Sequence, residues 1–333
     1  NNVQVAFVSD KLAIYAFQTE CLSSNPDPAL IDLSGLSCIV ISGADSSTFL
    51  QGQLTNNVNN LSNHQAQLTS YCTPKGRMLA IMYLIRLDEN YLVILPEEIA
   101  DSVISRLKMF VLRSKVEINL AADLTLAGAC GLPGSELATL IGQDVPDQDF
   151  CLTQSDNNIC IKIPATIDRY LYIGTPLKAA DIKVYSGIYW TWLDIISGIP
   201  SLSSATQEAF VPQMANLELI DGVSFNKGCY PGQEIVARLH YLGNANRRMF
   251  RIECEGGQAI GAGDDIYTSG SGQSIGKVVS AVSDQSGHHH GLAVIRIDAV
   301  KSGELSVHSS QGNPVKILPL PYPVPTEPKE KTD

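Results

Sequence analysis

A single cysteine in the segment "NKGCYPGQE", residues 226–234, has the neighbours that make a thiol reactive. Cys229 comes just before "QEIVARLHYL", a stretch of helical character, and Pro231 suits the first turn of a helix because its missing N–H costs nothing there. The N-terminus of a helix favours an anion, and Lys227 adds positive charge nearby. We therefore expect an exposed, reactive thiol. The alternative is a free cysteine that fills a gap beside a turn.

Glycines and basic residues surround this thiol. Gly228 and Gly232 permit backbone angles or close approaches that a side chain would block. The whole chain carries a net charge of −11, but residues 227–248 carry +3, because four basic side chains there oppose one acid: Lys227, Arg238, Arg247, Arg248 and Glu234. Such a local patch favours a small polyanion, for example a phosphate or carboxylate chain. The alternative is that the arginines only solvate the end of a strand.

Composition and cysteine spacing narrow the classes of protein. Apolar residues make up 44% and charged residues 17% of the 333, as in ordinary globular chains, and this length favours two or three packed units. The acidic balance disfavours direct binding to nucleic acid, which calls for a basic face. None of the eight cysteines has the C-x-x-C spacing of a zinc or thioredoxin motif.

No stretch approaches the roughly 20 apolar residues of a membrane span, and no signal peptide opens the chain. We expect a cytoplasmic protein with reduced thiols and no membrane partner.

The elements that must position the thiol follow an α+β pattern. A buried strand is predicted at 35–43, three strands joined by two turns over 66–96, and a helix over 96–112. Strands and one helix between 115 and 185 repeat this pattern in part. After Arg248 the sequence is all-β with Gly-rich turns, which predicts a small barrel or sandwich.

Three domains and a tail are expected. The patterns indicate one α+β unit within residues 1–115, a second over 116–185 and a β-barrel over 243–320. Residues 321–333 are charged and rich in proline, so we expect a mobile tail there.

The thiol segment closely resembles the signature of the YgfZ family, whose motif runs K-G-C-Y-x-G-Q-E. The segments "ISGADSSTFLQGQLTNNV", "SYCTPKGRM" and "FVPQMANLELIDGVSFNKGCY" are also similar to family segments and follow the family order. The family is similar in fold to the T-protein of the glycine cleavage system, a tetrahydrofolate-dependent aminomethyltransferase with three domains, the last a β-barrel. The resemblance implies that residues 1–115 together with 186–242 make a folate-binding, T-protein-like α+β domain. The resemblance implies a monomeric, folate-binding protein of the bacterial cytoplasm that supports iron–sulfur enzymes, including those that thiolate tRNA.

The resemblance also assigns individual residues. Cys229 matches the family cysteine on which function depends, and the rest of the motif is matched by Lys227, Gly228, Tyr230, Gly232, Gln233, Glu234 and Arg238. Trp190 falls at the family's folate-associated tryptophan, so the resemblance implies that a pterin stacks on its indole. The alternative for Trp190 is ordinary helix packing, and its neighbour Trp192 competes for the role.

Two positions depart from the patterns of the relatives. Leu36 stands where the family has a second folate-associated tryptophan; leucine offers apolar contact but no stacking, so we expect weaker folate binding or a different pose. Aligned with T-protein, the chain has Ala80 in place of the catalytic aspartate. We therefore expect tetrahydrofolate or a derivative to be bound but not used for aminomethyl transfer.

Several functions are compatible with this sequence. The first is a folate-binding accessory factor for iron–sulfur proteins, whose link to tRNA is indirect. A transient cluster on Cys229 would need further ligands from folate, glutathione, a partner or a second copy, because clusters usually take four thiolates; Cys72 is a candidate neighbour. The alternatives are a folate-dependent one-carbon transferase, which Ala80 disfavours, and a folate-independent thiol or redox protein, which needs Cys229 but not Trp190.

The run of histidines in "SGHHHG", residues 286–291, is the remaining motif with metal-binding residue types. Adjacent side chains point in different directions on any regular backbone, so three neighbours do not converge on one ion. We expect no metal there.

Overall fold

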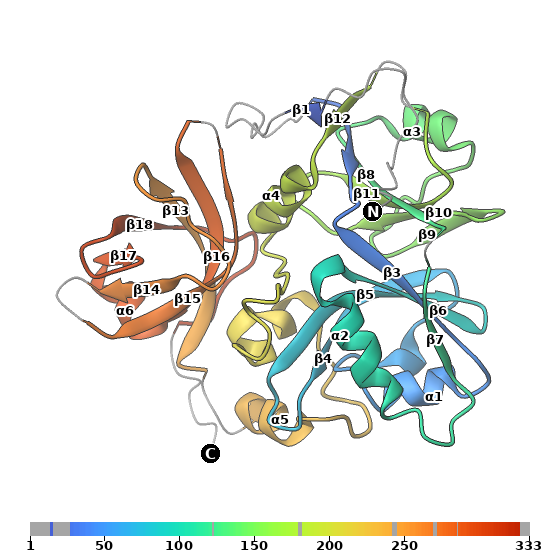
Figure 1. The fold of residues 1–333 in the computed structure, drawn as a ribbon, viewed down its shortest axis with the longest axis horizontal. Helices are drawn as coiled ribbons and strands as arrows, with labels where there is room; N and C mark the ends of the chain where they lie inside the picture. Colours follow the sequence, from blue (N-terminus) through green and yellow to red (C-terminus); the bar gives the residue numbers. More distant parts are fainter. Residues whose placement is uncertain are drawn as a thin grey trace. The chain divides into compact units, whose positions relative to one another are not determined.

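The structure is a computed structural model and describes residues 14–15, 27–121, 123–178, 182–241, 245–268, 272–284 and 286–326 (Figure 1). Cys21 and the last part of the expected tail, 327–333, lie outside these residues. The chain divides into two compact units. Unit 1 comprises Asn1–Leu50, Val58–Leu68 and Met82–Leu193, and unit 2 comprises Gln51–Asn57, Thr69–Ile81 and Asp194–Asp333.

A seven-stranded sheet makes up one part of unit 1. Its order is β1 (Ile14–Tyr15), β12 (Lys183–Tyr185), β2 (Ala29–Asp32), β8 (Thr125–Cys130), β11 (Arg169–Gly174), β10 (Asn158–Ile163) and β9 (Leu152–Ser155). The pairs β1–β12 and β12–β2 are parallel and the others are antiparallel. Helix α3 (Gly134–Ile141) packs Leu137 and Ile141 into a buried cluster with Cys160, Tyr170 and Tyr172 of this sheet.

A second sheet has five strands. Its order is β4 (Gln65–Cys72), β5 (Met78–Leu87), β6 (Asn90–Pro96), β3 (Leu36–Ser42) and β7 (Glu117–Leu120), and β4, β5 and β6 are the three strands predicted from 66–96. Helix α1 (Ser46–Gln51) and the short 3-10 helix η2 (Val58–Asn60) follow β3. Helix α2 (Glu97–Lys108) lies against β3, β6 and β7 and buries Ile99, Val103 and Leu107. The helix was predicted to reach residue 112, but it ends at Lys108 because residues 109–113 form turns.

The C-terminal part of unit 2 is a closed barrel, which confirms the predicted β-barrel. Its order is β13 (Arg247–Glu255), β16 (His288–Arg296), β15 (Ser274–Ser283), β14 (Asp265–Thr268), β17 (Leu305–Val307) and β18 (Asn313–Leu318), with helix α6 (Ile297–Ser302) after β16 (Figure 1). Alternate residues of these strands point inward, so Ile252, Ile266, Val278 and Val307 form its apolar core.

Short helices lead from unit 1 to the barrel along the chain. They are α4 (Gly187–Ser197), the 3-10 helices η3 (Pro212–Ala215) and η4 (Leu217–Ile220), and α5 (Gln233–Tyr241). In the segment expected to be a mobile tail, the Tyr322 hydroxyl donates to the Gly198 carbonyl at 2.7 Å and Val324 packs against the barrel core, so this part of the tail is held in place. Among the described residues, no helix has the length and apolar character to cross a membrane.

Candidate functional site

Cys229 lies in an exposed turn of unit 2 that leads into α5. The helix begins at Gln233, so Pro231 stands in the turn before it and not in its first turn as predicted. The thiol therefore precedes the helix by about one turn of chain. The prediction that Cys229 is exposed agrees with its position.

Lys227 ties this turn to a distant part of unit 2. Its Nζ donates to three main-chain carbonyls, those of Gln51 at 2.7 Å, Leu54 at 2.6 Å and Asn56 at 3.0 Å. The ammonium also lies 5.0 Å from the centre of the Tyr230 ring. Burial lowers the pKa of Lys227 to about 8. The charge of Lys227 is thus directed at backbone oxygens and at an aromatic face, and its role is to anchor the turn.

Gly232 fixes the turn on the other side of the thiol. Its φ is +83°, and a Cβ there would lie 2.5 Å from Gly76 Cα and 2.6 Å from the carbonyl oxygen of Thr73. Only glycine fits this conformation so close to the turn between β4 and β5. Gly228 differs, because a Cβ there would meet no heavy atom within 4 Å. Of the two motif glycines, Gly232 is required by the fold, and Gly228 leaves open space beside Cys229.

Tyr230 forms the buried base of the turn. It lies close enough to Cys72 for the two to interact electrostatically, and burial raises the pKa of its phenol. Cys72 is 1% exposed, and burial raises the pKa of its thiol to about 12. Burial sets Cys72 apart from the exposed Cys229, and its role as a neighbouring ligand stays a prediction.

The remaining motif residues lie on the first turns of α5. Gln233 is half-buried, whereas Glu234 and Arg238 are exposed to solvent. The buried side of the helix is held by Gln213, whose amide donates to the Val236 carbonyl at 2.6 Å. Glu234 and Arg238 therefore present charge on the same helix as the turn that carries the thiol.

Fewer basic side chains are available near Cys229 than the net charge of +3 over residues 227–248 predicts. Arg248 is buried on β13, where its Nη1 lies 2.5 Å from the Glu218 carboxylate and 2.7 Å from the Gln213 carbonyl. Lys227 is used as an anchor. The charge count over residues 227–248 did not include these partners, because Glu218 and the carbonyls that accept from Lys227 and Arg248 lie outside that segment. Arg238 and Arg247 are the two of the four cations that remain for an anionic ligand.

A pocket of about 470 Å³ opens beside the motif segment within unit 2, and sequence reasoning missed it. Its walls combine aromatic, acidic and amide side chains: Asn56, Glu218, Asp221, Val223, Ser224, Phe225, Asn226, His240 and Tyr241. The rings of Phe225 and His240 stack at 3.6 Å between centroids. The spacing of Phe225 and His240 in the sequence does not predict this stack. The two rings meet only because α5 folds back on the segment before the thiol turn.

The residues linked to folate by resemblance lie in a different setting. Trp190, on α4 in unit 1, is only 4% exposed, and the Arg169 guanidinium stacks on its ring with 4.4 Å between Cζ and the ring centre. Trp192 is also buried and packs near Tyr189. Leu36, half-buried at the start of β3, pairs with Pro96 of β6. Ala80, on β5, is fully buried and belongs to unit 2 with Cys229.

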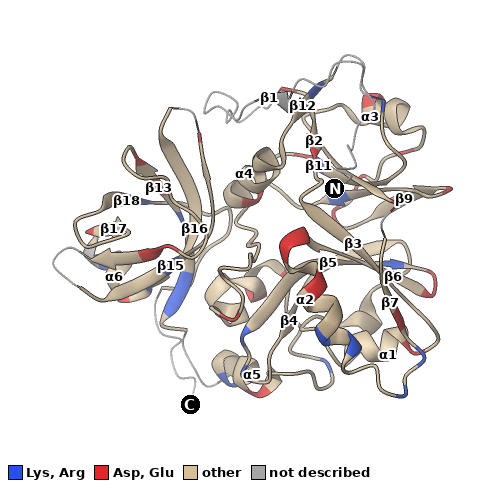
Figure 2. Cartoon of the chain, in the orientation of Figure 1, with Lys and Arg blue, Asp and Glu red and all other residues tan. Residues whose placement is uncertain are grey.

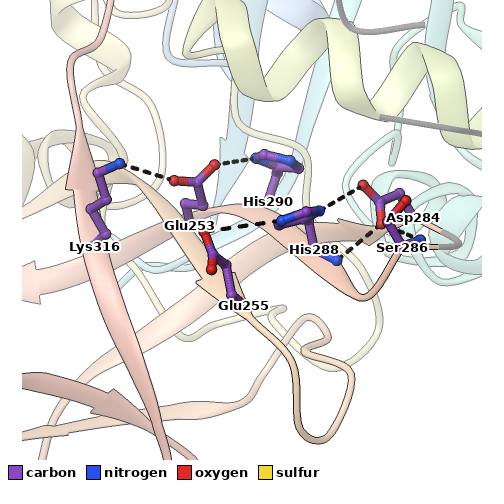
Figure 3. A network of polar contacts seen from close by, with 7 residues as sticks. All are labelled: Glu253, Glu255, Asp284, Ser286, His288, His290 and Lys316. Atoms are coloured by element: carbon purple, nitrogen blue, oxygen red, sulfur yellow. Dashed lines mark hydrogen bonds and ion pairs between the residues drawn. The ribbon is translucent and has the colours of Figure 1, made fainter. Parts of the chain in front are cut away.

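The three histidines lie on strand β16. Figure 3 shows two of them, His288 and His290, among their acidic neighbours. His288 and His290 pair across the strands with Glu255 and Glu253, while His289 points to the other face. The two ring nitrogens of His288 lie near different carboxylates, Nδ1 3.6 Å from Asp284 and Nε2 4.0 Å from Glu255. Across the described part of the chain, no three His, Cys, Asp or Glu side chains form a set that could hold a metal ion.

Comparison with known proteins finds two family models that match separate parts of the chain, and relatives that match most of its length. Residues 4–175 match the family model described as the GCVT N-terminal domain, and residues 246–321 match that of the CAF17 C-terminal beta-barrel domain. The chain is 29% identical over 320 residues to the tRNA-modifying protein YgfZ of Pectobacterium carotovorum, covering 93% of this chain and 96% of that protein. It is also 29% identical over 318 residues to the YgfZ protein of Yersinia pestis, covering 92% and 96%.

The fold has a solved counterpart as well. The glycine cleavage system aminomethyltransferase T of Bartonella henselae superposes with a TM-score of 0.75 at 15% identity, covering 91% of this chain and 88% of that one. This likeness confirms the predicted fold, and the YgfZ relatives confirm the resemblance seen in the thiol motif. Because the GCVT model covers more than half of its residues, the chain belongs to the GCVT N-terminal domain family, with YgfZ proteins among its relatives.

Proposed function

We propose that this protein is an accessory factor for iron–sulfur enzymes that act in tRNA modification, and that Cys229 is its working thiol. The curated relatives carry the name tRNA-modifying protein, which supports the link to tRNA. The acidic balance of the chain, −11, supports an indirect link through enzymes over direct binding of RNA. The protein works as a monomer in the cytoplasm and meets these enzymes as protein partners.

The observation that carries this proposal is the setting of Cys229. It is the exposed thiol among the described cysteines, and it is fixed on one side by Lys227 and on the other by Gly232. A thiol held in this way can meet a partner's sulfur or metal without moving its own backbone. One sulfur cannot hold an iron–sulfur cluster, so the other ligands of a cluster in transit come from the partner.

Folate, as tetrahydrofolate or a derivative, is part of the proposal through the resemblance. The residues at the sites that the resemblance assigns to folate fit it only in part. Stacking of a pterin on Trp190 requires an open indole face, but that face is covered by Arg169 and the side chain is 4% exposed. Ala80, fully buried, supplies no carboxylate for an aminomethyl transfer of the T-protein kind.

A folate-independent thiol protein is the second candidate, and the burial of Trp190 favours it. It needs Cys229 alone. Calorimetric titration of tetrahydrofolate into the wild type, Trp190→Ala and Cys229→Ala separates the two. The first candidate predicts that the wild type and Cys229→Ala bind while Trp190→Ala does not. Absence of binding to the wild type leaves the thiol-only function.

The role of the thiol itself is tested in cells. A strain that lacks this protein should be complemented with the wild type, Cys229→Ser or Cys151→Ser, and its thiolated tRNA nucleosides measured by mass spectrometry. Cys151 is a partly buried thiol in unit 1 and serves as the matched control. We expect Cys151→Ser to restore these nucleosides and Cys229→Ser to fail. Restoration by Cys229→Ser contradicts both candidate functions.

A further inference from the structure

Apolar side chains project from the turn that follows helix α2 in unit 1. We call residues 109–115 the α2 tip. Met109 is 63% exposed, Phe110 41% and Leu112 87%. Single exposed apolar residues are normal on a protein surface, but three within four positions of one turn form a local patch. These side chains contribute little to the core of the unit, so their presence calls for another explanation.

Hydrogen bonds hold the backbone of the α2 tip. The Phe110 N–H donates to the Leu107 carbonyl at 3.0 Å, and the Ser114 N–H donates to the Val111 carbonyl at 2.8 Å. At its end the Lys115 N–H donates to the Asp45 carboxylate at 2.7 Å. Leu112 has a φ of +46°, a left-handed conformation that is unfavourable for a side chain other than glycine's. The fold thus holds Leu112 outward in a strained conformation.

Basic residues surround these apolar side chains. Arg106 and Lys108 lie in the last turn of α2, and Arg113 and Lys115 lie beyond it. No acidic residue occurs from 102 to 116, although the chain as a whole carries −11. Figure 2 shows the same contrast along α2, which begins with acidic residues and ends with basic ones. Arg106 and Lys108 complement the helix dipole, but the two cations beyond the helix do not have that role.

We propose that the α2 tip is a docking surface for an anionic lipid bilayer. Apolar side chains on a projecting turn can enter the interface of a bilayer while the surrounding cations stay at the headgroups, where each adds attraction to an anionic leaflet. A phosphate backbone of RNA would engage the cations but would gain nothing from Met109 and Leu112. A stable protein interface buries about 800 Å² on each side, which is more than three side chains present.

The proposal is that the α2 tip attaches to the surface of a membrane, not that any segment crosses the membrane. The expectation of no membrane partner rested on the absence of a long apolar stretch, and a short tip of this kind leaves no such signal. Binding through three apolar residues and four cations is reversible and falls as salt screens the cations. The proposal is independent of the function proposed for Cys229, because every residue it uses belongs to unit 1.

The test is co-sedimentation of the full chain with vesicles. One set contains phosphatidylcholine alone, and the other contains about one third phosphatidylglycerol. We expect binding to the anionic set, loss of most of it on raising NaCl from about 0.05 to about 0.5 M, and little binding to the neutral set. The double variant Met109→Ser/Leu112→Ser should bind about tenfold more weakly. Ile188→Ser, which removes another exposed apolar side chain of unit 1, should bind as the wild type does.

Three results overturn the proposal. The first is equal sedimentation of the wild type with the neutral and the anionic vesicles. The second is undiminished binding by Met109→Ser/Leu112→Ser, which assigns the attachment to another surface. A parallel gel-shift with tRNA covers the RNA alternative: retardation of tRNA that depends on Arg113 and Lys115 but not on Leu112, without vesicle binding, also overturns it. Far-ultraviolet circular dichroism confirms that each variant is folded.

Discussion

The ammonium of Lys227 donates to the main-chain carbonyl of Leu54 at 2.6 Å, although the two residues are 173 positions apart in sequence. The same nitrogen bonds the carbonyls of Gln51 and Asn56, so one cation links the thiol turn to the segment that follows α1. All of these residues lie in unit 2. The motif lysine beside Cys229 is therefore part of the support of the turn.

Replacing Lys227 by methionine should destabilise the protein. The variant keeps most of the aliphatic length but loses three charge-assisted hydrogen bonds, so we expect the free energy of unfolding to fall by about 2–3 kcal/mol. Urea unfolding followed by circular dichroism measures it. Lys178→Met, at an exposed lysine of unit 1 outside any helix, is the control and should change stability by less than about 0.5 kcal/mol. Equal stability of the two variants would show that the anchor contributes nothing.

The same lysine makes a prediction about pH. Burial lowers its pKa to about 8 in the folded protein from 10.5 in the unfolded chain. Between these values the unfolded state binds more protons, so the stability of the wild type relative to Lys227→Met should increase from about pH 8 to about pH 10. Urea unfolding of both proteins over this range tests it. A difference that stays constant with pH contradicts the lowered pKa.

The two motif glycines should respond differently to alanine. Gly232→Ala puts a Cβ 2.5 Å from Gly76 Cα at a φ of +83°, so we expect a loss of about 2–4 kcal/mol or failure to fold. Gly228→Ala meets open space and should change stability by less than about 0.5 kcal/mol. Thermal unfolding of the pair measures this contrast. A large loss for Gly228→Ala would mean that its backbone is also constrained.

His290 should make the barrel sensitive to acid. Burial on β16 lowers its pKa below the ordinary value of 6.5, and the Glu253 carboxylate at 3.8 Å offsets this only in part. Because the unfolded state takes up a proton first as pH falls, the stability from neutral His290 is present above about pH 6.5 and is lost below it. His290→Gln should flatten the decline in stability between about pH 7 and about pH 5, whereas His64→Asn, at an exposed site, should not.

Local patterns predicted much of this molecule. The meander β4–β6 and the barrel strands followed from alternation and Gly-rich turns, and the rare composition around Cys229 identified the thiol turn. Contacts between distant segments were not predictable. The carbonyl partners of Lys227, the close approach of Gly232 to Thr73 and the pairing of Arg248 with Glu218 all arise only after folding. For the same reason the net charge of +3 over residues 227–248 overestimated how many basic side chains are available to a ligand.

The cover over Trp190 was missed for a related reason. A resemblance places the tryptophan in the sequence, but the residue that stacks on it, Arg169, comes from strand β11 of the seven-stranded sheet. Likewise, the helical spacing of apolar residues in α2 did not indicate that the chain would turn at Met109, or that Leu112 would adopt a left-handed conformation.

The central claim is that Cys229 is the thiol this fold presents to its partners. Its most direct test is alkylation of the native protein with iodoacetamide, with the label on each cysteine followed over time by mass spectrometry. We predict that Cys229 is labelled first and that the buried thiols Cys38, Cys72, Cys130, Cys160 and Cys254 are labelled only after denaturation. Labelling of Cys72 as fast as Cys229, or protection of Cys229 in the native protein, contradicts the account.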